Sequence, residues 1–265
     1  MTKLSLQIIP TDLLERYKDD FDKNAKKGFE ELYDSEISMD TFSFYTSVAA
    51  VYSSKIEGEN IDLDSFIKHK RFGTTCQPDY TRKIDDLYDA YLFAQKTKLS
   101  AKSLEHAHAQ LTKHILQKTQ QGKFRKINMF VVTKDGKIEY VAAAPDKLKS
   151  EMKKFYIDMD TLLKANLSFE EVFFFASLLH LVFVKIHPFE DGNGRTSRLL
   201  EKWFIAQKLG DNAWFIQSER NYYDQHQTYY NNIRRLGLEY DELNYAEALP
   251  FLQILPNAIN YKGNA

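Results

Sequence analysis

The spacing of hydrophobic positions predicts a chain built mostly from amphipathic helices. Residues 80–96 place apolar side chains at intervals of three and four, which is helical periodicity. A second such stretch follows Ser103, a candidate N-cap, and carries apolar positions through Ile115. Upstream, Asp40 is a candidate N-cap for a helix from residue 41 to about residue 57, with a glycine after it as the stop.

The most hydrophobic helix is predicted at residues 169–186. This stretch is apolar nearly all round, so we expect it at the centre of the fold. Ser168 and Glu171 have the spacing of a capping box at its start. Pro145 suits the first position of the helix before it. After it we expect one helix that ends near Gly210, and then a tyrosine-rich helix at 222–235.

One segment has the pattern of strands instead. Residues 127–133 and 138–141 are rich in β-branched and aromatic side chains, and Asp135-Gly136 lies at the centre of the turn between them. A lone hairpin is marginally stable in water, so it must pack on the helices. The pattern therefore predicts an all-α fold with one small β-hairpin.

Composition excludes several function classes. The formal net charge is -1, which gives no basic face for nucleic acid and no polybasic patch for a membrane. Cys76 is the only cysteine, so an internal disulfide and a cysteine-based zinc site are excluded. The longest apolar run is shorter than the roughly 20 residues that cross a bilayer, and the start of the chain has no signal-peptide pattern. We expect a cytoplasmic protein.

The candidate chemistry is concentrated at residues 187–198, directly after the apolar helix. Two glycines there let the backbone turn and let a ligand approach its amides. The next helix would offer unpaired N–H groups to an anion, and two arginines three residues apart suit phosphate oxygens. An aspartate suits Mg²⁺, and a histidine suits proton transfer near neutral pH. The residues concerned are His187, Asp191, Gly192, Asn193, Gly194, Arg195 and Arg198.

Each of these features is common alone: a histidine after an apolar helix is usually structural, and Asp-Gly-Asn-Gly is usually a turn. Their conjunction within twelve residues is what indicates a site. The run His187-Pro-Phe-Glu-Asp-Gly-Asn-Gly-Arg-Thr-Ser-Arg198 resembles the Fic family signature, His-Pro-Phe-x-(Asp/Glu)-Gly-Asn-Gly-Arg-x-x-Arg, at every fixed position. The similarity extends over roughly residues 103–235.

The resemblance implies a Fic-type helical bundle in which the hairpin is a flap beside the active site. It divides the chain into an N-terminal helical region (1–100), a Fic core (101–240) and a C-terminal extension (241–265). It also implies transfer of AMP from ATP, with Mg²⁺, to a Ser, Thr or Tyr hydroxyl of a target protein, one option being the chain itself. The flap, 127–141, would dock the target; a homodimer is left open.

The resemblance also assigns roles within the motif. His187 would deprotonate the target hydroxyl, and Asp191 would hold Mg²⁺ on the phosphates. Residues 192–194 would form the anion hole, with Asn193 near the α-phosphate. Arg195 and Arg198 would bind the β- and γ-phosphates.

Several alternatives stay open. The phosphoryl-transferring Doc branch carries a different residue at the position of Gly194, so this sequence favours nucleotidyl transfer. Transfer of UMP or phosphocholine uses the same scaffold, and some relatives remove AMP. A nucleotide-binding scaffold without catalysis is the hypothesis from another class, and the intact His187 and Asp191 argue against it.

A second motif lies upstream. Glu57 falls in the last turn of its helix, where a negative charge is disfavoured by the helix dipole. Ser53, Glu57 and Gly58 resemble the fixed positions of the Fic inhibitory motif, (Ser/Thr)-x-x-x-Glu-(Gly/Asn). The resemblance implies that Glu57 forms a salt bridge with Arg198 and keeps ATP from binding productively.

Two tyrosines are less decided. Tyr229 and Tyr230 lie in the helix after the motif, where relatives carry a pair that lines the adenine pocket. An aromatic face can stack on adenine, but tyrosines at this spacing are as often core. Both interpretations stay open.

Overall fold

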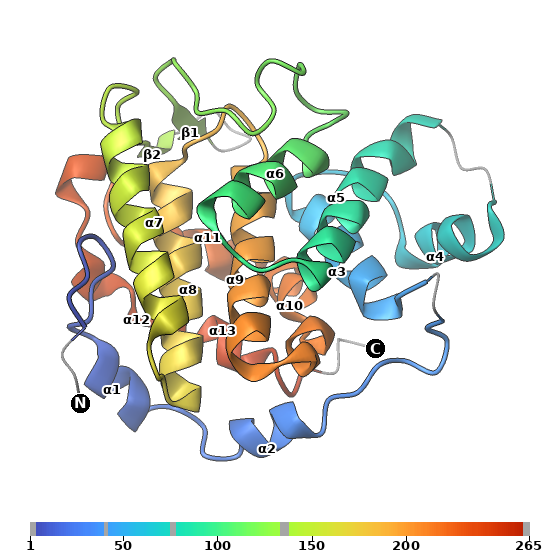
Figure 1. Cartoon of the computed structure of the whole chain (residues 1–265), viewed down its shortest axis with the longest axis horizontal. Helices are drawn as coiled ribbons and strands as arrows, with labels where there is room; N and C mark the ends of the chain where they lie inside the picture. The colour runs from blue at the N-terminus through green and yellow to red at the C-terminus, as the bar shows by residue number, and fades with distance from the viewer. Residues whose placement is uncertain (1–3, 40–41, 75–77, 133–137, 262–265) are drawn as a thin grey trace.

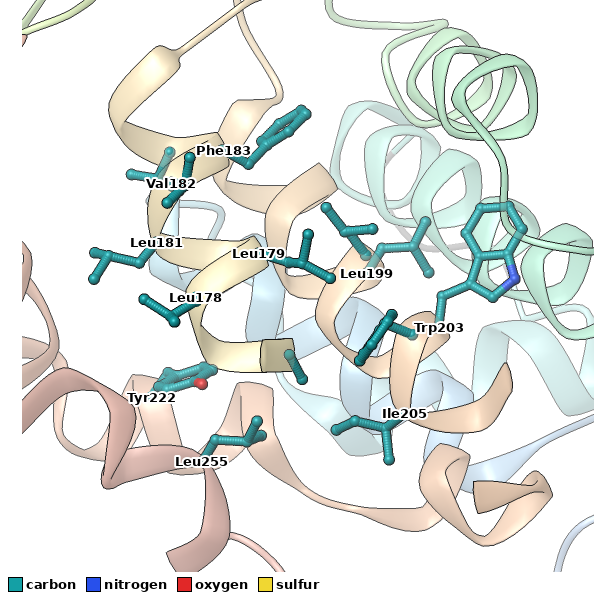
Figure 2. Close-up of a cluster of buried hydrophobic side chains, with 14 of the residues drawn as sticks. Leu178, Leu179, Leu181, Val182, Phe183, Leu199, Trp203, Ile205, Tyr222 and Leu255 are labelled. Atoms are coloured by element: carbon teal, nitrogen blue, oxygen red, sulfur yellow. The ribbon is translucent and has the colours of Figure 1, made fainter. Parts of the chain in front are cut away.

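The computed structural model describes residues 4–39, 42–74, 78–132 and 138–261. Helices α8 (Phe169–Ile186) and α9 (Asn193–Leu209) lie side by side at its centre, as Figure 1 shows. Nearly every α8 side chain is buried, as its all-round apolar sequence predicts. Figure 2 shows part of the interface, where Leu179 of α8 points toward Leu199 of α9. This pair fixes the loop between the two helices.

The other elements surround this pair. Before it come α1 (Leu14–Asp19), α2 (Ala25–Glu30), α3 (Phe44–Ile56), α4 (Leu63–Phe72), α5 (Pro78–Lys96), α6 (Ala101–Leu111), β1 (Phe130–Val132), β2 (Ile138–Val141) and α7 (Leu148–Lys164). After it come η1 (Asp211–Phe215), α10 (Ser218–Asp224), α11 (His226–Arg234), η2 (Tyr240–Glu242), η3 (Tyr245–Glu247), α12 (Leu249–Leu252) and α13 (Ile254–Asn257). The predicted all-α fold with one small hairpin is confirmed.

Two predicted helix starts were wrong. Ser43, not Asp40, caps α3: its backbone is extended and its hydroxyl accepts the N–H of Thr46. Residues 40 and 41 lie outside the described residues. Ser100, not Ser103, caps α6, because Ser103 is the third residue of a capping box in which the two serines bond each other's backbone N–H.

Three further expectations on helix limits were also wrong. Pro145 precedes α7 in a turn, and the helix begins at Leu148. Helix α6 stops at Leu111 and does not continue to Ile115. The tyrosine-rich stretch forms two helices, because Gln225 leaves helical geometry and separates α10 from α11. The capping box at Ser168 and the limits of α8 are confirmed.

The hairpin packs on the helical body, as its small size requires. Strands β1 and β2 pair antiparallel, with a register shift between Val131 and Val132. The outer edge of β2 is partly covered, because the N–H of Val141 donates to the carbonyl of Leu238 at 2.8 Å. The predicted turn at residues 134–137 lies outside the described residues.

A buried carboxylate anchors the N-terminal segment. Asp158 of α7 is fully buried, and its oxygens accept the backbone N–H groups of Gln7, Ile8 and Ile9 at 2.8–3.0 Å. The segment has no regular secondary structure there, so these bonds replace the ladder that a helix or strand would give its amides.

Asp158→Ala should therefore destabilise the fold by about 3 kcal/mol, because three amides lose their acceptor at once. Urea unfolding would measure the loss. Asp160→Ala is the matched control, since Asp160 is exposed and pairs only with Lys164 one turn away. Equal stability of the two variants would contradict the anchoring role.

Within the described residues, each helix falls short of the length or the apolarity that a membrane span needs.

Candidate active site

The motif begins where α8 ends. His187 follows the last turn and has a left-handed backbone (φ 52°, ψ 61°), the one positive φ among the described non-glycine residues. The Nδ1 atom of its ring lies 2.9 Å from the hydroxyl of Tyr140 on β2. That hydroxyl also donates to the carbonyl oxygen of Val184 at 2.9 Å. The flap thus contacts the candidate base directly.

A buried arginine holds this strained turn in place. Arg125 is 2% exposed; its Nε donates to the carbonyl of His187 at 2.7 Å, and its backbone N–H donates to Pro188 at 2.9 Å. The same guanidinium donates to the carbonyls of Ile127 and Ala143, at the two ends of the hairpin. A left-handed residue other than glycine persists only where its surroundings fix it. Arg125 does so and joins flap to motif.

The middle of the motif is pressed against α6. Gly192 has φ +79°, and a Cβ atom there would lie 2.6 Å from Cγ2 of Thr112 and 3.1 Å from Cδ1 of Leu111. No other residue type fits this approach without displacing α6. Glycine at this position therefore sets the depth at which the loop lies.

His108 of α6 supports the same loop from below. Its Nε2 donates to the carbonyl of Asp191 at 2.9 Å, and its Nδ1 accepts the N–H of Gly122 at 2.9 Å. The ring also stacks on Phe189, with centroids 3.6 Å apart. Both partners require a neutral ring with the proton on Nε2. His108 thus has a structural role, and with the other described residues it forms no metal-binding cluster.

Asn193 closes the loop with its own side chain. Its Oδ1 accepts the N–H of Phe189 at 3.0 Å, and its Nδ2 donates to the carbonyl of the same residue at 2.8 Å. The predicted position near an α-phosphate is thereby limited to its backbone N–H, since the amide side chain is already committed.

The start of α9 has the donors that an anion site needs. Gly192 precedes the helix and supplies no side-chain cap, so the first amides of this 17-residue helix keep their donors for a ligand. Arg195 lies in the first turn and is 5% exposed. Its Nε and Nη1 are buried without a hydrogen-bond partner among the described residues. Buried unpaired guanidinium donors of this kind fit a phosphate ligand.

Asp191, the predicted Mg²⁺ ligand, lies beside the first turn of α9 and close to Arg195. Its side chain is 50% exposed, and one oxygen lies 3.4 Å from Nη2 of Arg195. No group of three or more metal-ligating side chains occurs among the described residues. A single exposed carboxylate fits Mg²⁺, which takes few protein ligands and keeps water and substrate phosphates around it.

Arg198 lies one turn further along α9 and is fully buried. Its Nη2 donates to Oε1 of Glu57 at 2.6 Å, so the predicted salt bridge is confirmed. Its Nε donates to the hydroxyl of Ser53 at 2.8 Å, and Nη2 also reaches the Ser53 carbonyl at 3.0 Å. Gly58 ends α3 with φ +93°, which lets the chain turn away directly after Glu57. The two predicted motifs thus meet across α3 and α9.

The Glu57 carboxylate lies over the start of α9. A Cβ atom on Gly194 would be 2.4 Å from Oε1 of Glu57, so the carboxylate rests on the glycine itself. Burial opposes its charge, but Arg198 and Arg195 overcome that effect and lower the pKa of Glu57. The same contact raises the pKa of Arg198 despite its burial. The position thus stabilises negative charge.

The two tyrosines are placed differently. Tyr229 is 1% exposed, and its hydroxyl lies 2.9 Å from Nε2 of His180 and 3.4 Å from Nη1 of Arg198. Burial raises its pKa to about 12. It belongs to the core behind the site. Tyr230 is partly exposed and meets Tyr229 edge-on, so the adenine-lining role stays a prediction that suits Tyr230 better.

The sequence is similar to proteins of one known family. Residues 98–205 match the Fic/DOC family. This chain carries a Fic/DOC family domain. The protein adenylyltransferase Fic of Nematostella vectensis is 27% identical to it over 220 residues, which are 83% of this chain and 42% of that protein. The chain thus spans less than half the length of this relative.

Solved structures show the same fold. A Fic family protein from Desulfovibrio desulfuricans superposes with a TM-score of 0.68 at 18% identity, covering 98% of this chain and 74% of that one. A Fic domain containing signaling protein from Bacteroides thetaiotaomicron gives 0.64 at 16% identity, with 94% and 91% covered. Fic-1 from C. elegans gives 0.61 at 16% identity, with 93% and 68% covered.

Sequence reasoning missed three residues that shape the site of this Fic domain: Arg125, Tyr140 and, in its supporting role, His108. Tyr140 comes from a different part of the chain than the motif it contacts, and Arg125 acts through backbone carbonyls. Neither spacing nor residue type in one sequence reveals such contacts.

Two histidines of the Fic domain should make stability depend on pH. Burial lowers the pKa of His108 to about 4. Burial and then the charge of Arg125 lower that of His187 to about 4. Between pH 6.5 and 4 the unfolded chain binds protons that the folded chain refuses, so stability falls as pH falls through this window. His108 alone removes about 1.4 kcal/mol for each pH unit below 6.5.

Urea unfolding at pH 7.5 and 5.5 would measure this loss. His108→Gln should weaken the dependence and leave the contribution of His187, whereas the exposed His106→Gln should leave the dependence unchanged. A dependence in His108→Gln equal to that of the unchanged chain would contradict the assignment.

Proposed function

We propose that this Fic domain is an adenylyltransferase that moves AMP from ATP to a Ser, Thr or Tyr hydroxyl of a target protein, and that Glu57 inhibits it. The observation that carries the proposal is the anion site at the start of α9. There, uncapped amides and the buried donors of Arg195, which have no hydrogen-bond partner among the described residues, lie in the same helix as Arg198. The likeness to the adenylyltransferase of Nematostella vectensis supports the same activity.

His187 suits the role of base. Its low pKa keeps the ring neutral at physiological pH, so it can accept a proton without first losing one. In the proposed step the target hydroxyl oxygen attacks the α-phosphorus, and its proton goes to Nε2 of His187. The bond from the α-phosphorus to the bridging oxygen breaks, and pyrophosphate leaves. Charge on the phosphates is met by the amides of residues 193–195 and by the two arginines.

Mg²⁺ would be held by Asp191 and would neutralise part of the phosphate charge. The side chains would then act mainly by positioning the reactants and stabilising charge, because these two effects account for most of the rate enhancement in phosphate transfer.

The inhibition follows from charge competition. Glu57 is an anion held by Arg198 and resting on Gly194, and the γ-phosphate of ATP would need the same arginine. Nη2 of Arg198 already donates to Glu57 and to the Ser53 carbonyl, so a phosphate oxygen that binds it would have to displace the carboxylate. In the proposed resting state the nucleotide therefore cannot be aligned for transfer.

The position of the label in ATP tests the reaction class. We expect Glu57→Gly protein to incorporate label from α-labelled ATP into itself or into lysate proteins, and none from γ-labelled ATP. Label from the γ position would instead indicate phosphoryl transfer. Absence of both labels, with ATP binding retained, would favour a nucleotide-binding scaffold.

A further inference from the structure

The flap contributes a residue that acts on the candidate base. Tyr140 is 3% exposed on β2, and its hydroxyl lies 2.9 Å from both Nδ1 of His187 and the carbonyl oxygen of Val184. The two rings meet edge-on, with centroids 6.0 Å apart. No motif in the sequence marks this tyrosine.

Hydrogen-bond chemistry decides the direction of these two bonds. A carbonyl oxygen only accepts, so the phenol proton goes to Val184. The phenol oxygen is then left as an acceptor toward His187, and Nδ1 carries the ring proton, which the nearby carbonyl of Val184 also favours. The lone pair of the neutral imidazole is consequently on Nε2, which has no hydrogen bond to any described residue.

Arg125 and Lys185 support this arrangement. Arg125 fixes the backbone of His187 through its carbonyl at 2.7 Å and holds both ends of the hairpin. Lys185 places its ammonium 4.4 Å from the centre of the Tyr140 ring. The cation favours the ring face and opposes rotation of the tyrosine. Lys185 of α8 thus holds the Tyr140 ring, and Arg125 holds the hairpin that carries it.

We propose that Tyr140 is a positioning residue that sets the tautomer of His187 and so makes Nε2 the proton acceptor. The inference rests on the proposed function for its effect on rate, but not for its effect on the tautomer. Because Tyr140 belongs to the flap, the state of the base is coupled to the segment that lies over the site. In catalytic histidines generally, the hydrogen bond made by one ring nitrogen determines which nitrogen carries the proton.

Tyr140→Phe keeps the ring and removes the hydroxyl. In ¹⁵N-labelled protein near pH 7, the Nδ1 resonance of His187 should lie in the protonated range before the change. In the variant it should shift toward a mixture of the two tautomers. In the Glu57→Gly background, kcat for AMP transfer should fall about 10-fold to 100-fold, with KM for ATP unchanged, because the phenol touches the base and no phosphate-binding residue.

Tyr156→Phe is the matched control, since it also loses one phenol hydrogen bond, to Glu105 at 3.2 Å, and lies away from the base. Thermal unfolding of each variant checks that the fold is kept. An unchanged His187 tautomer in Tyr140→Phe would overturn the inference even if AMP transfer is found. A shifted tautomer without any transfer activity in either protein would instead count against the proposed function alone.

Discussion

Replacing Glu57 with glycine should raise AMP transfer on the order of 100-fold at ATP concentrations below saturation. The carboxylate lies 2.6 Å from Nη2 of Arg198, and its side chain is only 25% exposed. Charge pairs in such surroundings are worth roughly 3 kcal/mol, which is a factor of about 100 when a phosphate competes for the same arginine. The variant should also be less stable without nucleotide, because it leaves a fully buried guanidinium without its counter-charge.

Two comparisons distinguish loss of the Glu57 charge from general destabilisation of the protein. Glu57→Gln should raise activity in the same direction, because it removes the charge and keeps the size. Glu59→Gln is the matched control: Glu59 follows two residues later and pairs with Lys83 at 2.7 Å, away from the site. Thermal shift by Mg-ATP should be larger in both Glu57 variants than in the control. Equal transfer by Glu57→Gly and the unchanged chain at every ATP concentration would refute the inhibitory role.

His187→Ala should remove nearly all transfer from the Glu57→Gly protein, by about 10²-fold to 10⁴-fold in kcat. His187 directly follows α8 and is the proposed base, and its low pKa leaves the imidazole neutral at pH 7. The phosphate-binding groups on α9 do not depend on it. ATP binding, followed by thermal shift or calorimetry, should therefore stay within a few-fold of the parent.

His106→Ala is the control for this change, because His106 is an exposed histidine whose ring packs at a tilt against Phe93 of α5. It should leave both binding and transfer intact. Full transfer by the His187→Ala protein would exclude this residue as base. Lost ATP binding in the same variant would mean that the side chain holds the loop, not the proton.

The sequence revealed the site better than it revealed helix limits. Residues 187–198 are contiguous, so their chemistry could be recognised before the fold was known. The contact between Glu57 and Arg198 was expected from the resemblance and is present. The limits of α3 and α6 were misplaced because several Ser and Asp residues could cap each helix, and only the backbone conformation at Ser43 and Ser100 decides between them.

The role of Tyr229 shows another limit of the pattern. Helical spacing of aromatic residues describes both a ligand pocket and a core, and only the buried contact of its hydroxyl with His180 distinguishes them. Tyr140 and Arg125 were out of reach for a related reason. Both bond to His187 from more than 40 residues away along the chain, Arg125 at its backbone carbonyl and Tyr140 at its ring.

The two contacts of Ser53 with Arg198 have a consequence for how the proposed inhibition could be relieved. Ser53 and Glu57 belong to the same end of α3, but in the proposal only Glu57 competes with phosphate, whereas Ser53 holds the guanidinium through its hydroxyl and its carbonyl. Helix α3 would therefore both inhibit, through Glu57, and position Arg198, through Ser53. On this proposal, a signal that moves only the Glu57 side chain would free an Arg198 guanidinium that Ser53 still holds in place for a phosphate. A signal that moves the whole of α3 would also remove the two Ser53 contacts.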